Sequence, residues 1–196
     1  MFADSYALAG KRKDMVISCY LIRHGNDYML WDAGFGAELA GRTEEPIPGV
    51  TVSLKRTIAD QLGDLGIKPE QVTVIGISHM HYDHVSQAAS FPRAKLLIGA
   101  EDLAILSSDP KDPLLEPQRL APWLKGGAPR EGVTGDKDVF GDGSVVMILD
   151  PNGLAGAGDL AMGDDVAAAA QSSFPHPPLG VSRRDSTLTR RRRSPS

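Results

Sequence analysis

The sequence predicts an α/β fold, because short apolar runs of strand length alternate with segments of helical periodicity. A second observation is a cluster of histidine and aspartate residues directly after one of these runs, at residues 79–84. The third is a sharp change of composition after Asp150, where glycine, alanine, proline and arginine dominate. The length of 196 residues fits one domain. We therefore expect a folded domain over 1–149 and a low-complexity tail over 150–196.

The first elements are predicted to form a hairpin. Residues 15–22 are an apolar run and predict a buried strand, and residues 23–27 carry a turn signal. Residues 28–31 then return as the second strand, after which 32–36 leave the sheet. The single cysteine, Cys19, lies in the first strand, so we expect a buried thiol and no intrachain disulfide.

The next element is a predicted helix over residues 51–65. Its apolar positions fall at helical spacing, and Gly66 follows where a helix is expected to end. These apolar positions are Leu54, Ile58, Leu62 and Leu65.

The remaining elements of the domain are shorter. Strands are predicted over 72–77 and 94–98, and a short helix over 100–106. Residues 107–135 are rich in proline, glycine and charge, which predicts a long surface loop. A hairpin over 139–149 is the last predicted element.

The residues after Asp150 have the composition of a disordered tail. Glycine and alanine dominate residues 151–163, and an alanine run follows at 167–170. We expect no strand or amphipathic helix of useful length in this tail. The arginine run at 190–193 leaves nucleic-acid binding or targeting as alternatives, but the absence of interleaved aromatic residues favours a solvated end.

Charge and hydropathy exclude several classes of protein. The net charge of −4 argues against a general nucleic-acid binder. No apolar stretch approaches the roughly 20 residues that a membrane-spanning helix needs. No signal peptide is visible, so a cytoplasmic location is the default expectation, and a longer exported precursor stays open.

The histidine cluster reads His79, His81, Asp83 and His84. Residues two apart in an extended segment point the same way, so His79 and His81 can bind one ion together. Asp83 and His84 follow where the chain turns and can face a second ion. Imidazole and carboxylate suit zinc, and also iron or manganese. The alternative, a cluster of packed core histidines, is disfavoured because adjacent imidazoles titrate near neutral pH and add little packing.

The motif resembles the metallo-β-lactamase superfamily, and its flanking segments resemble the N-acyl homoserine lactonase-like branch. The resemblance covers residues 15 to about 149, and the segments 18–25, 30–34, 78–85 and 89–106 carry it. It implies the N-terminal half of an αβ/βα sandwich. It also implies two divalent metal ions, with zinc expected.

The resemblance assigns roles to the site residues. His79 and His81 would bind the first metal ion, and Asp83 and His84 the second. Metal-bound hydroxide would attack the ester carbonyl of a small-molecule lactone, with Asp83 as the catalytic residue that orients the nucleophile or passes a proton to the leaving alkoxide. Asp32 would not bind a metal ion itself but would hold the metal-binding loop and orient its ligands. A turn or helix-capping aspartate is the alternative for Asp32.

The sequence departs from the family after residue 149. The family takes further histidines from a Gly-His-Thr-Pro-Gly-His-like element, whereas residues 150–158 contain none. Of the two histidines outside the cluster, His24 lies in the first hairpin turn and His176 in the tail. We therefore expect a truncated or frame-shifted chain that binds one metal ion or none. A catalytically inactive remnant with partial metal binding is the alternative function.

Overall fold

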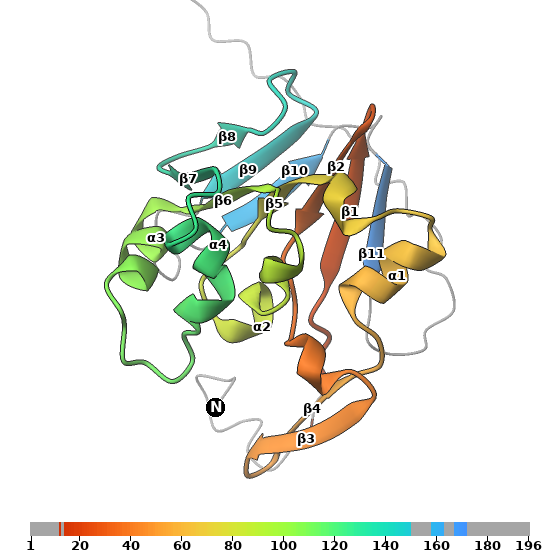
Figure 1. Ribbon diagram of the computed structural model, residues 1–196, viewed down its shortest axis with the longest axis vertical. Helices are drawn as coiled ribbons and strands as arrows, with labels where there is room; N and C mark the ends of the chain where they lie inside the picture. Colours follow the sequence, from red (N-terminus) through yellow and green to blue (C-terminus); the bar gives the residue numbers. More distant parts are fainter. Residues whose placement is uncertain (1–11, 13, 150–157, 163–166, 172–196) are drawn as a thin grey trace, which may run out of the picture.

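The computed structural model describes residue 12 and residues 14–149, 158–162 and 167–171. Its centre is a six-stranded sheet in the order β11-β1-β2-β5-β6-β7 (Figure 1). The strands are β1 (Cys19–His24), β2 (Asp27–Trp31), β5 (Val72–Gly76), β6 (Lys95–Gly99), β7 (Arg130–Val133) and β11 (Ala167–Gln171). β1 runs antiparallel to β2 and β11, whereas β2, β5, β6 and β7 are parallel. The prediction of an α/β fold is confirmed.

Helices cover one face of this sheet and a smaller antiparallel sheet covers the other. The helices are α1 (Ile58–Asp64), α2 (Tyr82–Val85), α3 (Ala100–Ser107) and α4 (Ala121–Leu124), with short 3-10 turns at Ala37–Leu39, Pro69–Gln71, Ala88–Ser90 and Pro117–Leu120. The second sheet has the order β10-β9-β8, formed by β10 (Gly158–Met162), β9 (Val145–Leu149) and β8 (Lys137–Asp138).

The alternation of side chains along β2 divides the core into two layers. Leu30 packs into the cluster beneath the helices, whereas Met29 and Trp31 pack against the second sheet. From β9, Val145 and Met147 complete this second layer, and both side chains are 0% exposed. The chain therefore buries both faces of its main sheet.

The prediction of a helix over 51–65 was wrong in its first half. Val50–Leu54 is a strand, β4, which pairs with β3 (Arg42–Ile47) in a hairpin that projects from the body (Figure 1). The helix α1 begins only at Ile58. The β-branched run at 50–52 prefers a strand, and the helical spacing of Leu54 was coincidental.

The start of α1 is fixed by a capping box. The Thr57 hydroxyl accepts a hydrogen bond from the Asp60 N–H at 3.0 Å, and the Asp60 carboxylate accepts from the Thr57 backbone N–H at 3.2 Å. Gly66 follows the helix with φ +69°, a conformation that favours glycine. The predicted end of this helix is therefore confirmed.

Other predicted boundaries also need correction. The first strand begins at Cys19 instead of Met15, whose side chain is 55% exposed. The segment 107–135 is not a plain loop, because it contains α4 and the edge strand β7. The last hairpin pairs β9 with β8 at 137–138, two residues earlier than predicted. Tertiary packing and pairing, which short-range patterns do not report, decide these segments.

The expectation that no strand follows Asp150 was wrong for two segments. β10 pairs with β9, and β11 pairs with β1 at the edge of the main sheet. The rest of the tail, with the arginine run and His176, lies outside the described residues. The domain boundary at residue 149 therefore stays a prediction. Within the described part of the chain, none of the helices has the length and apolar character to cross a membrane.

The topology gathers the polar residues at one edge of the main sheet. β2, β5 and β6 are parallel neighbours, so their carboxyl ends share an edge. Asp32 follows β2, the histidine cluster follows β5, and α3 follows β6 directly. Ligand sites of α/β proteins form at such an edge.

Candidate metal centre

The cluster spans the loop between β5 and α2, with His79 and His81, and the helix α2 itself, with Asp83 and His84, and backbone hydrogen bonds hold both ends of the loop. The Ile77 N–H donates to the Leu97 carbonyl at 2.9 Å, which continues the β5–β6 pairing. The Tyr82 N–H donates to the Leu114 carbonyl at 3.0 Å, and the His84 N–H donates to the His81 carbonyl at 3.0 Å. The predicted ligands therefore come from a loop and a short helix of defined geometry.

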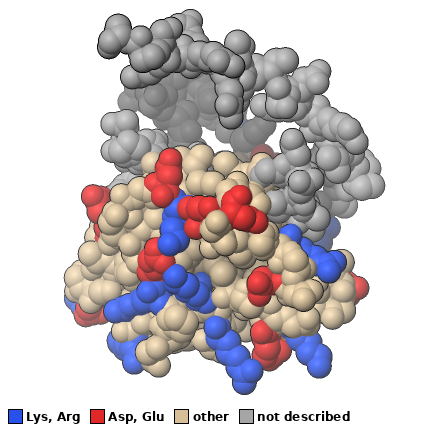
Figure 2. Space-filling view, turned by 90° about the horizontal axis from the view of Figure 1, so that it is seen from above, with Lys and Arg blue, Asp and Glu red and all other residues tan. Residues whose placement is uncertain are grey.

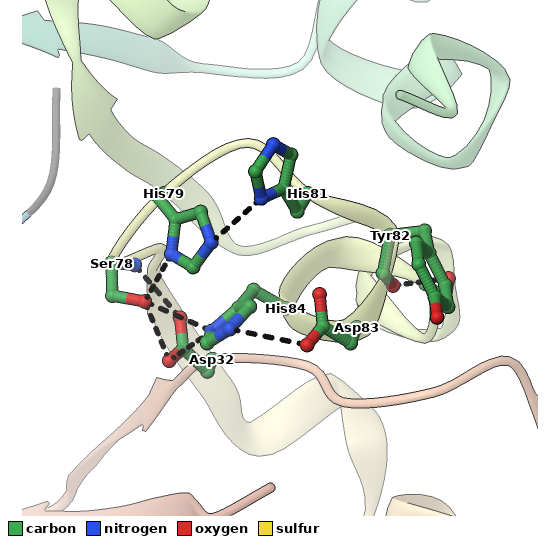
Figure 3. A network of polar contacts seen from close by, with 8 residues as sticks. Asp32, Ser78, His79, His81, Tyr82, Asp83 and His84 are labelled. Carbon is green, nitrogen blue, oxygen red and sulfur yellow. Dashed lines mark hydrogen bonds and ion pairs between the residues drawn. The ribbon is translucent and has the colours of Figure 1, made fainter. Parts of the chain in front are cut away.

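Three of the predicted ligands can reach one ion. His79, Asp83 and His84 each offer one ligand atom, and these atoms lie within 4.8 Å of one another. His84 Nε2 and Asp83 Oδ2 are 3.6 Å apart. His81 stands beside this group, with its Nδ1 3.1 Å from His79 Nε2 (Figure 3). Among the described residues this is the one group of three such ligands. The assignment of His79 and His81 to a first ion, and of Asp83 and His84 to a second, stays a prediction.

Asp32 supports this loop from β2. Its carboxylate is 4% exposed and accepts hydrogen bonds from the Ser78 backbone N–H at 2.7 Å and the Ser78 hydroxyl at 2.8 Å. His84 Nδ1 lies 2.8 Å from Asp32 Oδ2 (Figure 3). Asp32 adopts φ 61°, a left-handed conformation that aspartate tolerates better than most residues. The geometry favours the supporting role over a turn or helix cap.

The contact with Asp32 also orients His84. A carboxylate accepts hydrogen bonds, so the proton of the neutral His84 ring sits on Nδ1. Nε2, on the side of Asp83, then keeps its lone pair. This arrangement of carboxylate and histidine is the one that holds metal-ligating imidazoles in other proteins.

The pKa values of His79 and His84 are shifted in opposite directions. Burial, reinforced by the neighbouring rings of His84 and His81, lowers the pKa of His79 to about 4. Burial also opposes charge on His84, but the hydrogen bond from His84 to Asp32 and the nearby carboxylates together raise its pKa. His79 is therefore neutral at pH 7, the form in which imidazole binds metals.

Ser78 is a residue of the candidate site that the sequence interpretation left without a role. Its hydroxyl lies 3.0 Å from His84 Nδ1 and 3.4 Å from His79 Nδ1, besides its bond to Asp32. The available signal was a small hydroxyl residue directly before the first histidine. Ser78 links the supporting carboxylate to two candidate ligands.

His24 is separate from the cluster, as expected. Its Nε2 lies 2.8 Å from Asp142 Oδ2, and its ring stacks on Phe140 with centroids 4.2 Å apart. These contacts join the β1–β2 turn to the β8–β9 loop. His24 therefore has a structural position between the two sheets.

The donor set fits a divalent metal ion. It combines a neutral imidazole at His79, an oriented imidazole at His84 and the Asp83 carboxylate, with His81 adjacent. Nitrogen and oxygen donors of this kind suit zinc, and two histidines with one carboxylate also suit iron(II). The residues present are thus compatible with the cation that the motif implies.

Comparison with known proteins identifies the family. The sequence profile of the metallo-beta-lactamase superfamily matches residues 12–157, about three quarters of the chain. The chain belongs to the metallo-beta-lactamase superfamily. The match extends beyond residue 149, where the motif resemblance was expected to stop.

The proteins that this chain resembles include N-acyl homoserine lactonases. N-acyl homoserine lactonase AiiB of Agrobacterium fabrum is 24% identical over 98 residues, which are 46% of this chain and 35% of that protein. A solved N-acyl homoserine lactone hydrolase, with N-hexanoyl-L-homoserine bound at its catalytic metal centre, superposes with a TM-score of 0.58 at 17% identity. The dizinc lactonase AidC superposes with a TM-score of 0.53 at 15% identity.

These matches are partial in length. Each structural match covers 74% of this chain, but only 57% of the N-acyl homoserine lactone hydrolase and 51% of AidC. It covers about a third of the curated relative AiiB. The structural likeness, at such low identity, shows a common fold.

Proposed function

We propose that this protein is a metal-dependent hydrolase whose substrates are small lactones or related esters. The observation that carries the proposal is the group formed by His79, Asp83 and His84 at the carboxyl edge of the sheet, with His84 oriented by Asp32. The lactonases among the relatives support lactones as the substrate class.

The chain's own residues prepare the site for this chemistry. When bound, a divalent cation supplies Lewis acidity, which can lower the pKa of a water molecule to about 7 and polarise a carbonyl oxygen. His79 offers a neutral nitrogen donor, and Asp32 and Ser78 keep the His84 ring oriented. Rigid support of this kind preserves ligand geometry during a reaction.

Asp83 is the proposed catalytic residue. Its carboxylate can bind the same ion as His79 and His84, because the three ligand atoms lie within 4.8 Å of one another. About a quarter of its side-chain surface is exposed. A carboxylate in this position can orient an attacking water or carry a proton to the leaving alkoxide of an opened lactone.

Lactone opening provides the direct test, because it releases a proton that a pH indicator reports. The zinc-loaded full chain should hydrolyse N-hexanoyl homoserine lactone, and Asp83→Ala and His81→Ala should each reduce the rate at least 100-fold. His24→Ala, outside the cluster, is the matched control and should retain activity. Absence of turnover in folded, zinc-loaded protein would contradict the proposal.

A second candidate, metal binding without turnover, rests on the ligand count. The described residues offer a single three-ligand group, whereas the expected pair of ions requires more donors. Metal analysis of the purified protein separates the two functions. Close to two ions per chain supports the hydrolase, and one ion without lactone opening supports the binding remnant.

A further inference from the structure

Gln87 is a buried residue that lies just beyond α2, the helix that carries Asp83 and His84. Its side chain is 3% exposed. Its Oε1 accepts a hydrogen bond from the Ile58 N–H at 2.8 Å, and its Nε2 donates to the Phe35 carbonyl at 2.7 Å. A backbone N–H can only donate and a carbonyl can only accept, so these two partners fix the orientation of the side-chain amide.

The two partners of Gln87 belong to different parts of the fold. Ile58 is the first residue of α1, whereas Phe35 lies in the segment that follows β2 and Asp32. They are 29 and 52 residues away from Gln87 along the chain. Because polar groups that lose a partner at a buried position are costly, this side chain connects the two parts with some force.

The bond to Phe35 extends a row of backbone hydrogen bonds between the segments 33–35 and 84–87. The backbone bonds of the row are Ala33 N–H to His84 O at 2.6 Å, Ser86 N–H to Gly34 O at 3.1 Å and Gln87 N–H to Ala33 O at 3.0 Å. The Gln87 side chain adds a further bond at Phe35. Since α2 has 4 residues and is too short to be stable alone, its placement depends on tertiary bonds of this kind.

This row lies directly beside the contact that orients His84. Asp32 precedes Ala33, and its Oδ2 lies 2.8 Å from His84 Nδ1 (Figure 3). Ala33 and His84 are also joined through their backbones. The row therefore sets the distance between the Asp32 carboxylate and the His84 ring, and Asp83 moves with the same short helix.

Capping of α1 does not fully account for Gln87. Thr57 is the N-cap of this helix and forms a capping box with Asp60, to which Gln87 adds its bond from the Ile58 N–H. A cap requires only an acceptor. The Nε2 of Gln87 donates to Phe35, outside the helix, and this second bond needs another explanation.

Packing at this junction is incomplete, which gives the hydrogen bonds more weight. A cavity of about 150 Å³ borders Gln87, together with Gly34, Phe35 and Ile58. Side chains that line a cavity have fewer van der Waals partners. The segment after Asp32 therefore depends on its hydrogen bonds for a fixed position.

We propose that Gln87 is a positioning residue that holds the segment after Asp32 against the end of α2 and thereby sets the contact between Asp32 and the His84 ring. This inference rests on the proposed function, because it concerns the ligands of the same metal site. Without the side-chain amide, α2 and the segment 33–35 shift relative to each other, and His84 loses the orientation that suits metal binding.

Amide hydrogen exchange in the metal-free protein tests the connection without reference to activity. Gln87→Met keeps the length of the side chain and removes its amide. The backbone amides of Ala33 and Ser86 should then exchange at least about 10-fold faster, while the amides of β5 stay protected. Thr57→Ala weakens the cap of α1 and leaves the row intact, so it is the control and should keep both amides within about 3-fold of wild type.

The tautomer of His84 is the second readout, measured in the metal-free protein by the nitrogen-15 chemical shifts of the ring. In wild type the neutral ring should carry its proton on Nδ1, beside Asp32. Gln87→Met should give a mixture of the two neutral tautomers, because the ring no longer faces the carboxylate. Thr57→Ala should keep the wild-type tautomer, since a general loss of stability does not change it.

Zinc affinity, measured by competition with a chromophoric chelator, is the third readout. Gln87→Met should bind zinc at least about 10-fold more weakly than wild type, whereas Thr57→Ala should stay within about 3-fold. Gln87→Ala replaces Gln87→Met in every measurement if the latter does not fold. Unchanged exchange at Ala33 and Ser86, an unchanged His84 tautomer, or equal losses of affinity in the two variants would overturn the inference. If wild-type protein binds no zinc, the proposed function fails, and the exchange and tautomer measurements decide the role of Gln87.

Discussion

At the scale of single residues, the site depends on a buried carboxylate that acts through its neighbours. Asp32 accepts two hydrogen bonds from Ser78 and lies 2.8 Å from His84 Nδ1. Asp32 does not belong to the three-ligand group. The orientation of His84 is thus set by a residue that would itself not touch the ion.

Replacing Asp32 by asparagine should weaken metal binding while leaving the fold intact. Asparagine tolerates the left-handed backbone at φ 61°, but its amide N–H donates a hydrogen bond to His84 Nδ1, so that the ring proton must sit on Nε2. We expect zinc affinity to fall 10- to 100-fold. Nitrogen-15 chemical shifts of the His84 ring report the tautomer directly, and an unchanged tautomer would contradict the mechanism.

The buried carboxyl of Asp102 should make the wild-type protein less stable as the pH rises. Its folded pKa of about 6 lies above the ordinary value of 3.8, so the stability present below pH 4 is lost between pH 4 and pH 6. Relative to Asp102→Asn, the wild type should lose about 2 kcal/mol across this range. Urea denaturation of both proteins at pH 4 and pH 7 measures this difference, and parallel pH profiles would contradict it.

At the scale of elements, the sequence predicted the strands and the cluster better than it predicted helix boundaries. The strand over 72–77 and the histidine cluster after it are local features, strongly patterned along the chain. The hairpin β3–β4 was missed because Leu54 continued the spacing of α1 by coincidence. The edge strand β7 was missed because its pairing with β6 depends on tertiary context.

The site could be predicted only as far as short-range sequence reaches. The four residues of the motif and Asp32 carry recognisable spacing, so their neighbourhood was predictable. The burial of Asp102 was not predictable, because it depends on how α3 packs after β6. The grouping of His79 with Asp83 and His84 likewise depends on the turn into α2.

Gly76 ends β5 at the entrance to the metal loop, and alanine should not be tolerated there. An added Cβ would lie 2.6 Å from Trp31 Cε3 and 2.7 Å from Met29 Cε. We expect Gly76→Ala to destabilise the protein by about 1–3 kcal/mol through overpacking. Gly63→Ala in α1 is the control, because its Cβ meets nothing within 4 Å. Thermal unfolding of both variants measures the contrast.

At the scale of the whole molecule, stability depends on covering both faces of the main sheet. The face beneath the helices holds the larger apolar cluster, and β9 supplies the opposite layer. On the face in Figure 2, basic and acidic side chains are intermingled. The second sheet therefore contributes to the fold through apolar contact.

Truncating the Met147 side chain should show how much the second sheet contributes to the free energy of unfolding. Met147 is 0% exposed, whereas its neighbour Ile148 is 39% exposed on the same strand. We expect Met147→Ala to cost about 2–4 kcal/mol, and Ile148→Ala less than about 1 kcal/mol. Equal effects in urea denaturation would show that the two sheets do not pack as described.

The pairing of β1 with β11 has a consequence for synthesis on the ribosome. Cys19 lies opposite Gln171 in this pair, so β1 leaves the ribosome long before β11 is synthesised. At about 5–20 residues per second, the edge of β1 waits on the order of 8–30 s with open backbone groups. During that interval it can pair with a neighbouring nascent chain. Yield in the cell should therefore depend on translation rate and on chaperones that shield this edge.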